Sequence, residues 1–228
     1  MTTCSIHQPN FFPWMPYFDK IAMSDIFIFL DAVAYPKSGN SMGSWCNRVK
    51  ISTNEQNIWF SCPTLRESGP QLIKDVRINT SLLNTEKILK TLKYAYGKKE
   101  NYKKLNEIIL SMFLNSNWDL LADFNIYVIK KISELLGLKT TFIRQSDLNS
   151  SQLSSNEMLI DLCTQVKANE YLSGSGAKAY MMNNLFHEHG IAIKYQELDF
   201  TYKKYNLSIL NYLFEIEQEK WWSFNAKE

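Results

Sequence analysis

The sequence of 228 residues lacks the features that mark membrane, metal-binding and nucleic-acid-binding proteins. No stretch approaches the run of about 20 apolar residues that a membrane-spanning helix needs. None of the four cysteines belongs to a Cys-x-x-Cys pair, so neither a zinc site nor a redox motif is indicated. The 25 basic and 23 acidic residues nearly balance, which argues against a duplex-binding surface. We therefore expect no membrane span, no metal site and no nucleic acid among its partners.

We also expect no signal peptide, and the sequence shows no internal repeat or low-complexity linker. Its N-terminus carries neither the basic segment nor the apolar core of a secretory signal. The scattered cysteines, Cys4, Cys46, Cys62 and Cys163, are typical of reduced thiols, and we expect a cytoplasmic protein. A chain of 228 residues can bury a large core without disulfides, so we expect a single domain spanning residues 1–228.

What the sequence does contain is an alternation of apolar strands and amphipathic helices. Residues 3–6 form a short apolar run, residues 15–23 have helical spacing, and residues 26–30 form a second apolar run. This order predicts a parallel β-α-β crossover. Further strands are expected at 140–144, 170–172 and 191–195, and further helices at 156–166 and 177–187. We predict an α/β fold, a Rossmann-like parallel sheet with a β-hairpin insertion and an added helical bundle region.

The middle of the chain supplies the hairpin and the added helices. Residues 45–51 and 57–62 are expected to form the hairpin, and residues 72–78 a third strand. Helices are expected over 82–96 with Asn84 or Thr85 as cap, over 101–114, and over 118–136 with Asn117 as N-cap. The expected organisation is an α/β core with the hairpin in 1–80 and 138–200, a helical insertion in 81–137, and a C-terminal helix and tail in 201–228.

Polar or flexible residues follow three of the expected strands: His7-Gln8, Asp31 and the turn Ser173-Gly174-Ser175-Gly176. The carboxyl ends of parallel strands lie at one edge of a sheet, where α/β proteins bind ligands. Pro9 and Pro13 stiffen the loop after His7. We therefore predict that the loop from His7 to Trp14 is the floor of an active site.

Each of these residues has a chemical and a purely structural interpretation. His7 suits a general acid or base or a phosphate contact, or else its nitrogens are satisfied by the neighbouring turn. Asp31 suits a base or an acceptor of a substrate hydroxyl, or else it caps the next turn. The Ser-Gly turn suits an anion site at a helix N-terminus with Lys178 in the first turn, or else it only connects a strand to a helix.

The hairpin carries a further polar group. Asn47, Arg48 and Lys50 follow Trp45, and the planar guanidinium of Arg48 suits a phosphate or a carboxylate. The alternative is an exposed hairpin edge with a surface arginine. The 14% aromatic residues are expected mainly in the core, although they also suit surfaces that stack on sugars or bases.

The sequence resembles the WbqC-like family of bacterial proteins over nearly its whole length. The resemblance is carried mainly by Ile6-His7-Gln8-Pro9-Asn10-Phe11-Phe12-Pro13-Trp14, by Trp45 with Asn47 and Arg48, and by Tyr171 to Lys178. Pro16 stands where the family usually has a glycine, and the loop before Trp45 is longer. The family is associated with surface-polysaccharide and O-antigen gene clusters, hence with lipopolysaccharide.

The resemblance implies an enzyme that acts on a nucleotide-linked sugar. The expected activity is that of a transferase or an ATP-dependent acid–amine ligase, which transfers an acyl or aminoacyl group, such as glycyl, to an amino sugar. The expected catalytic residues are His7, Asn10 and Asp31. The expected substrate- or phosphate-binding residues are Gln8, Asn47, Arg48, Lys50, Ser173, Gly174, Ser175, Gly176 and Lys178.

The opening pattern also resembles, remotely, the start of HIGH-type nucleotidyltransferases and adenylate-forming ligases. The residues His-x-Gly-His are absent, and Asn10 stands where a second histidine would be expected. The remote resemblance leaves ATP with Mg²⁺ open as a cofactor. Three other functions stay open: an acyltransferase that uses a carrier-bound donor and the thiol of Cys4 or Cys46, a nucleotidyltransferase-like enzyme of a sugar-nucleotide pathway, and a non-catalytic sugar-nucleotide-binding protein. The oligomeric state is also open, with a homodimer among the options.

Overall fold

The computed structural model describes residues 1–36, 45–53, 55–65, 67–114, 117–149, 155–198 and 203–216. Its centre is a parallel sheet of five strands in the order β5-β2-β1-β6-β7. The strands are β1 (Thr3–His7), β2 (Ile26–Phe29), β5 (Thr141–Arg144), β6 (Glu170–Ser173) and β7 (Ala192–Tyr195). Counted along the chain, this order is 3-2-1-4-5, the arrangement of a Rossmann-type sheet.

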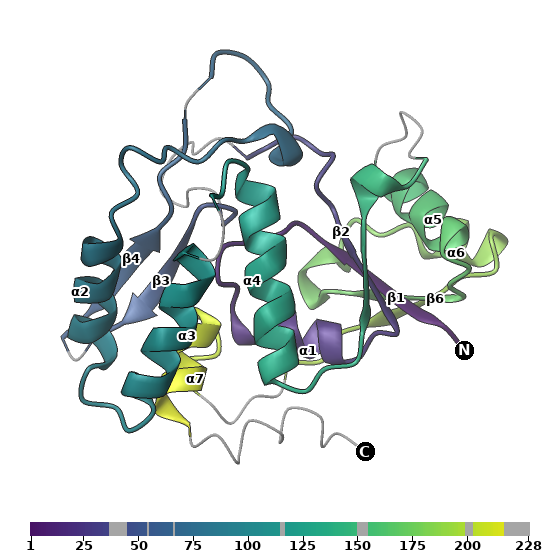
Figure 1. Cartoon of the computed structure of the whole chain (residues 1–228). Helices are drawn as coiled ribbons and strands as arrows, with labels where there is room; N and C mark the ends of the chain where they lie inside the picture. Colours follow the sequence, from purple (N-terminus) through teal and green to yellow (C-terminus); the bar gives the residue numbers. More distant parts are fainter. Residues whose placement is uncertain are drawn as a thin grey trace.

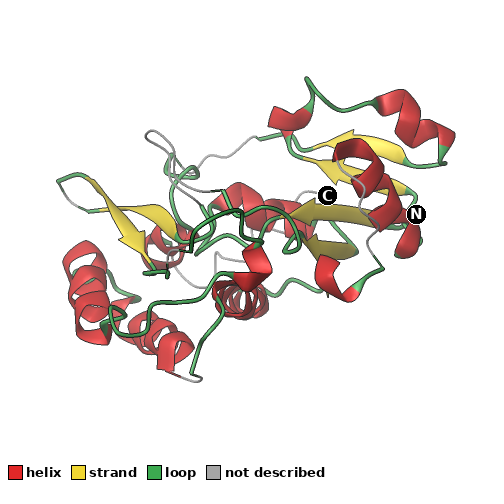
Figure 2. Cartoon of the chain, turned by 90° about the horizontal axis from the view of Figure 1, so that it is seen from above, coloured by secondary structure: helices red, strands yellow, loops and turns green. Residues whose placement is uncertain are grey.

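An antiparallel hairpin of β3 (Arg48–Ser52) and β4 (Asn57–Ser61) forms a separate two-stranded sheet. Figure 2 shows the hairpin standing apart from the parallel sheet. The mixed α/β fold with a parallel sheet and a hairpin is thus confirmed. Within the described part of the chain, no helix is long and apolar enough to cross a membrane.

The parallel sheet is covered on both faces by helices. On one face, Phe27 and Phe29 of β2 join the core that includes residues of α1 (Met15–Ala22) and α4 (Leu121–Leu135). On the other face, Ile6 and Ile28 pack with residues of α5 (Ser155–Gln165) and α6 (Asn183–Glu188). Because alternate residues of a strand point to opposite faces, β2 and β5 contribute to both cores. This explains why β2 was recognisable as a continuous apolar run.

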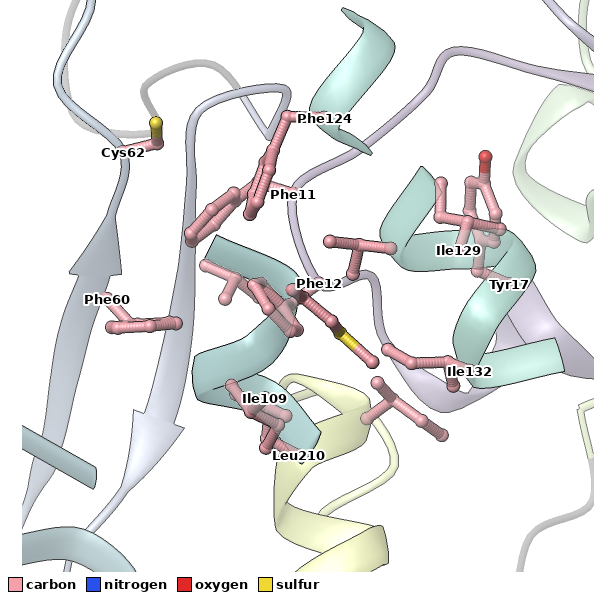
Figure 3. Close-up of a cluster of buried hydrophobic side chains, with 14 of the residues drawn as sticks. Phe11, Phe12, Tyr17, Phe60, Cys62, Ile109, Phe124, Ile129, Ile132 and Leu210 are labelled. Carbon is pink, nitrogen blue, oxygen red and sulfur yellow. The ribbon is translucent and has the colours of Figure 1, made fainter. Parts of the chain in front are cut away.

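The hairpin gathers with three helices at the other end of the molecule (Figure 1). These are α2 (Thr85–Tyr96), α3 (Tyr102–Leu114) and the short C-terminal α7 (Ile209–Glu215), and α4 lies between this group and the parallel sheet. The side chain of Asn84 accepts a hydrogen bond from the backbone N–H of Lys87 at 2.9 Å, which confirms the expected cap of α2. The shared core is aromatic: Figure 3 shows Phe11 and Phe12 beside Phe60 of β4 and Phe124 of α4.

Two predictions in the middle of the chain are wrong. Residues 72–78 form no strand but a 3₁₀ turn, Ile73–Asp75, because the N–H groups of Ile73 and Lys74 bond to the carbonyls of Val33 and Asp31. Helix α4 begins at Leu121 rather than after an Asn117 cap. The residues before it are extended instead, since Leu120 bridges to Arg77 and the N–H of Leu121 bonds to Val76.

The helix expected over 177–187 is also wrong. Residues Ser175–Ala177 form a 3₁₀ turn, and α6 starts only at Asn183. Asn156 of α5 explains the break, because its amide donates to the carbonyl of Tyr180 at 3.3 Å and accepts from the N–H of Met182 at 3.1 Å. These bonds compete with the helical bonds that the segment would otherwise make.

Candidate active site

The strand order reverses between β1 and β6, and the space at the carboxyl ends of these two strands is called the crevice below. Strand β1 pairs with β2 along its length, up to His7 opposite Phe29. Its pairing with β6 includes only Thr3 opposite Glu170 and Cys4 opposite Tyr171. The last residues of β1 and β6 are therefore not paired with each other. In doubly wound α/β sheets, ligands bind at such a reversal point.

His7 is the last residue of β1 and lies on the face that carries α1. Its ring contacts the rings of Tyr17 and Trp14 edge-on, at centroid distances of 4.8 and 5.8 Å. Its Nδ1 lies 3.1 Å from the carbonyl of Gln8. A carbonyl only accepts hydrogen bonds, so Nδ1 carries the proton and Nε2 is left as an acceptor. Burial, and next the charge of Lys20, lower the pKa of His7 to about 3; the imidazole is neutral at pH 7.

Lys20 of α1 is the cation of this crevice, and the sequence analysis did not select it. Its side chain is only 6% exposed, and a Cβ added at Gly174 would lie 3.6 Å from its Nζ. Among the described residues, no carboxylate forms an ion pair with it. Burial alone lowers the pKa of Lys20 to about 8. A buried ammonium without a counter-charge is costly, and an anionic ligand would compensate it.

The sequence did contain one signal for Lys20. Helix α1 has buried residues on every side, from Met15 to Ile21, so it offers a lysine no solvent-facing position. Its neighbour Asp19 is also buried and accepts a hydrogen bond of 2.6 Å from Nε2 of Gln196, beyond β7. Charged residues in a helix with apolar residues on all sides therefore deserve selection as site candidates.

The loop after His7 is fixed by contacts from three distant segments. Asn125 of α4 donates from Nδ2 to the carbonyl of Pro9 at 2.9 Å and to that of Cys46 at 2.7 Å. The N–H of Phe11 bonds to the carbonyl of Trp45 at 2.9 Å. The hydroxyl of Ser208, before α7, donates to the carbonyl of Phe12 at 2.9 Å. The loop is thus held rigidly from α4, from the hairpin and from the C-terminal helix.

Backbone strain accompanies this rigidity. Phe12 has a φ of 40°, in the left-handed region that bulky residues rarely occupy. Its ring is fully buried and packs against Phe60 and Phe113. The packing shown in Figure 3 supplies the energy that holds this conformation.

Gln8 and Asn10 meet around the thiol of Cys46. The Sγ of Cys46 lies 3.9 Å from Oε1 of Gln8 and 3.8 Å from Oδ1 of Asn10. Asn10 is only 2% exposed and Cys46 is fully buried. Cys4 lies in the core on the opposite face of the sheet from His7. Its hydrogen bond with Cys163, together with burial, raises the pKa of Cys4, so no Cys4–His7 pair exists.

Asp31 lies at the same sheet edge but faces Arg144 at the end of β5. Its fully buried carboxylate accepts from Nε of Arg144 at 2.8 Å and from the N–H and hydroxyl of Ser146 at 2.9 and 2.8 Å. Arg144 also donates to Asp123 at 2.6 Å. This network joins the ends of β2 and β5, and it occupies the oxygens that Asp31 would offer to a substrate.

The residues of the Ser-Gly turn separate in space. Ser173 is 1% exposed, and by strand alternation its side chain lies on the face of Tyr171, opposite to that of His7. Ser175 and Gly176 are exposed. Lys178 places its Nζ 5.6 Å from the ring centroid of Tyr195, at the end of β7. Gly174 is therefore the residue of this turn that faces the crevice, and it meets Lys20 rather than Lys178.

Three tryptophans connect His7 to the hairpin. The ring of Trp14 lies 5.8 Å from His7 and 5.4 Å from Trp45, and Trp45 lies 6.1 Å from Trp59 of β4. The guanidinium of Arg48 and the ammonium of Lys50 lie over the ring of Trp59, at 4.5 and 5.2 Å from its centroid. The third predicted site residue of the hairpin, Asn47, instead donates to the carbonyl of Cys62 at 3.3 Å. Among the described residues, no group of three or more His, Cys, Asp and Glu side chains is placed to hold a metal ion.

The comparison with known proteins decides the family. The model of the WbqC-like protein family matches residues 8–221. The chain belongs to the WbqC-like family. An uncharacterized protein of Mycobacterium tuberculosis, Rv1507c, is 27% identical over 230 residues, which cover 96% of each chain. No solved structure matches this WbqC-like chain. Family membership confirms the resemblance found in the sequence, and the name of this relative states no activity.

Proposed function

We propose that the protein is an enzyme of surface-polysaccharide biosynthesis, which transfers an acyl or aminoacyl group, such as glycyl, to the amine of a nucleotide-linked sugar. The observation that carries this proposal is the buried ammonium of Lys20, beside His7 and Gly174 and without a carboxylate partner. A cation in this position suits a phosphate group at the strand reversal. Membership of the WbqC-like family supports the setting in surface-polysaccharide synthesis.

The chemistry proceeds in two steps. The acid first reacts with ATP, which gives an acyl adenylate and releases pyrophosphate. The sugar amine then attacks the acyl carbonyl. An amide bond forms, the bond between the carbonyl carbon and the phosphate oxygen breaks, and AMP leaves while the amine loses a proton. Each step develops negative charge on a leaving phosphate, and positioning and electrostatic stabilisation are what such a reaction needs most.

The crevice provides groups for both requirements. The ammonium of Lys20 and the backbone at Gly174 face the leaving phosphate. The neutral imidazole of His7 offers Nε2 as acceptor to the attacking amine and so orients it. In this proposal Gln8 and Asn10 form the wall around Cys46, and Asp31 positions Arg144 at the neighbouring strand end.

The test is an activity assay with purified protein. A panel of nucleoside-diphosphate amino sugars is mixed with glycine, ATP and Mg²⁺, and both pyrophosphate release and the mass of the sugar nucleotide are measured. We expect pyrophosphate release to continue over many turnovers only when the acid and the amino sugar are both present. We expect Lys20→Met to abolish it and Lys90→Met, at a lysine on α2 whose side chain is 82% exposed, to leave it unchanged.

Two other outcomes would redirect the assignment. Acyl transfer from a thioester donor without ATP, lost on alkylation of Cys46, would replace the ligase reaction by a thiol acyltransferase. Tight binding of the sugar nucleotide with no turnover of any acid, ATP or thioester combination would make the protein a binding protein.

A further inference from the structure

The outer face of the hairpin carries two cations without counter-charges. Arg48 and Lys50 lie on the same face of β3 as Trp59 of β4, because Lys50 pairs with Trp59 in the hairpin register. Among the described residues, no carboxylate forms an ion pair with either cation. The Nε of Arg48 is buried and has no hydrogen-bond partner in the described part of the chain. Two positive charges are thus presented on one face of the hairpin, and no carboxylate in the described part of the chain neutralises them.

The indole of Trp59 fixes the position of both cations. Its ring is 39% exposed, with Arg48 and Lys50 at 4.5 and 5.2 Å from the centroid. The guanidinium of Arg48 lies over the indole, and a planar guanidinium offers paired N–H groups that can hold a phosphate bidentately. Stacking also lowers the entropy lost when a ligand binds, because the side chains are already ordered.

A cavity of about 340 Å³ opens beside Trp59, between β4 and α2. Apolar side chains, including Phe60 and Leu83, line it together with the polar residues Ser61, Asn84, Lys87 and Thr91. A volume of this size lies at the lower end of the range of small-molecule sites, and the polar residues suit the hydroxyl and ring-nitrogen groups of a nucleoside. A flat ring that enters it would meet the indole at its rim.

The order of these features matches the order of groups in a sugar nucleotide. The cavity comes first, the two cations on Trp59 follow, and Trp45 and Trp14 continue the row to His7. We propose that the hairpin is the acceptor subsite: the nucleoside enters the cavity, the diphosphate binds Arg48 and Lys50, and the sugar lies along Trp45 and Trp14 with its amine toward His7. This assignment rests on the proposed function, and it names the part of the molecule that selects the acceptor.

The test measures binding alone, by isothermal titration calorimetry. The probes are UDP, dTDP, GDP and CDP, a sugar nucleotide of the base that binds best, and inorganic pyrophosphate. Arg48→Met and Lys50→Met should each weaken the nucleoside diphosphate and pyrophosphate by about 10- to 100-fold, as expected for charge-assisted hydrogen bonds. Thr91→Phe fills the cavity and should weaken only the nucleoside diphosphate. Lys90→Met, also on α2, is the control and should change neither.

Several results would overturn the subsite. They are unchanged affinity in Lys50→Met, equal weakening of pyrophosphate and nucleotide by Thr91→Phe, or no binding of any of the nucleotides to the wild type. If Arg48→Met fails to fold by circular dichroism, Lys50→Met decides, because Lys50 is exposed. A failure of the proposed reaction gives a different result. The hairpin variants would then bind the nucleotide more weakly, as the subsite predicts, but the wild type would transfer no acid to any amino sugar. Conversely, acyl transfer that is lost in Lys20→Met but unchanged in Lys50→Met would overturn the proposed subsite and support the proposed reaction.

Discussion

Lys20 and Gly174 meet at the reversal point of the sheet: a Cβ added at Gly174 would lie 3.6 Å from Nζ of Lys20. The lysine comes from α1, the first crossover helix, and the glycine from the end of β6. A buried ammonium and a backbone without a side chain thus share the space where an anion would bind. Four predictions follow from this contact and from the hydrogen bonds around it.

Lys20→Met should increase the stability of the protein at neutral pH. The pKa of Lys20 is about 8 in the folded chain, against an ordinary value of 10.5. Below pH 8 the ammonium is charged in both states, and its burial costs on the order of 1–3 kcal/mol, which methionine avoids. Between pH 8 and 10.5 the unfolded chain binds more protons, so the stability of the wild type rises with pH and the difference from the variant shrinks. Urea unfolding at pH 7 and pH 10 measures both effects, and a variant less stable than wild type at pH 7 would contradict the prediction.

Gly174→Ala should preserve the fold and weaken anion binding. Gly174 has φ −68° and ψ 147°, which any residue adopts, so alanine should stabilise the chain by about 0.4–1 kcal/mol through the unfolded state. The added methyl group would occupy space next to the ammonium of Lys20, and we expect about tenfold weaker binding of ATP, whose phosphate the crevice is proposed to hold, a loss of about 1.4 kcal/mol. Gly176→Ala is the matched control, because a Cβ there meets nothing within 4 Å. Equal affinities of the two variants would show that the crevice does not bind the anion.

Asp31 and Arg144 should couple in stability rather than in catalysis. Asp31→Asn removes the buried partner of Arg144 and should destabilise the protein by about 2–4 kcal/mol. The double variant with Arg144→Met should lose less than the sum of the single variants, with a coupling of about 0.5–3 kcal/mol. Denaturant unfolding measures this cycle. A kcat that falls at least a hundredfold in Asp31→Asn, while the fold stays intact, would instead make Asp31 a catalytic residue.

Asn125→Leu should loosen the loop after His7. The substitution removes the two hydrogen bonds that the side-chain Nδ2 of Asn125 donates. The buried carbonyls of Pro9 and Cys46 thereby lose this donor. The expected loss is about 2–4 kcal/mol, together with faster amide hydrogen exchange at Phe11. Ser133→Ala on the same helix is the control, because its buried hydroxyl has no hydrogen-bond partner among the described residues. Normal exchange at Phe11 in Asn125→Leu would show that the hairpin and α7 suffice to hold the loop.

The parts of the fold that the sequence predicted are those set by local pattern. Strand β2 is a continuous apolar run because it is buried on both faces, and Asn84 caps α2 by a bond to a residue three positions on. The parallel arrangement also placed His7 and Asp31 at one edge before any contact was known. Local pattern is therefore enough to outline the sheet and to point to its carboxyl edge.

The failures come from bonds between distant residues. Asn156 stops the helix expected after Gly176, and Val76 bonds to the first residue of α4; neither partner is marked in the sequence near the element that it ends. The same holds for the site. Lys178 looked suitable because it follows the Ser-Gly turn, whereas Lys20 reaches Gly174 only through the packing of α1 against the sheet.

The hydrogen bond from Ser208 to Phe12 joins residues 196 positions apart, and two backbone contacts, from Ser208 to Lys50 and from Ile209 to Pro13, accompany it. During synthesis the loop after His7 therefore emerges from the ribosome long before the segment that closes over it. Contacts between such distant residues form late in folding. A nascent chain that has not yet released residue 208 lacks one of the three supports of this loop and should not bind ligand tightly. The loop therefore gains its full support only after residue 209 has been made, and tight ligand binding is expected only after that point.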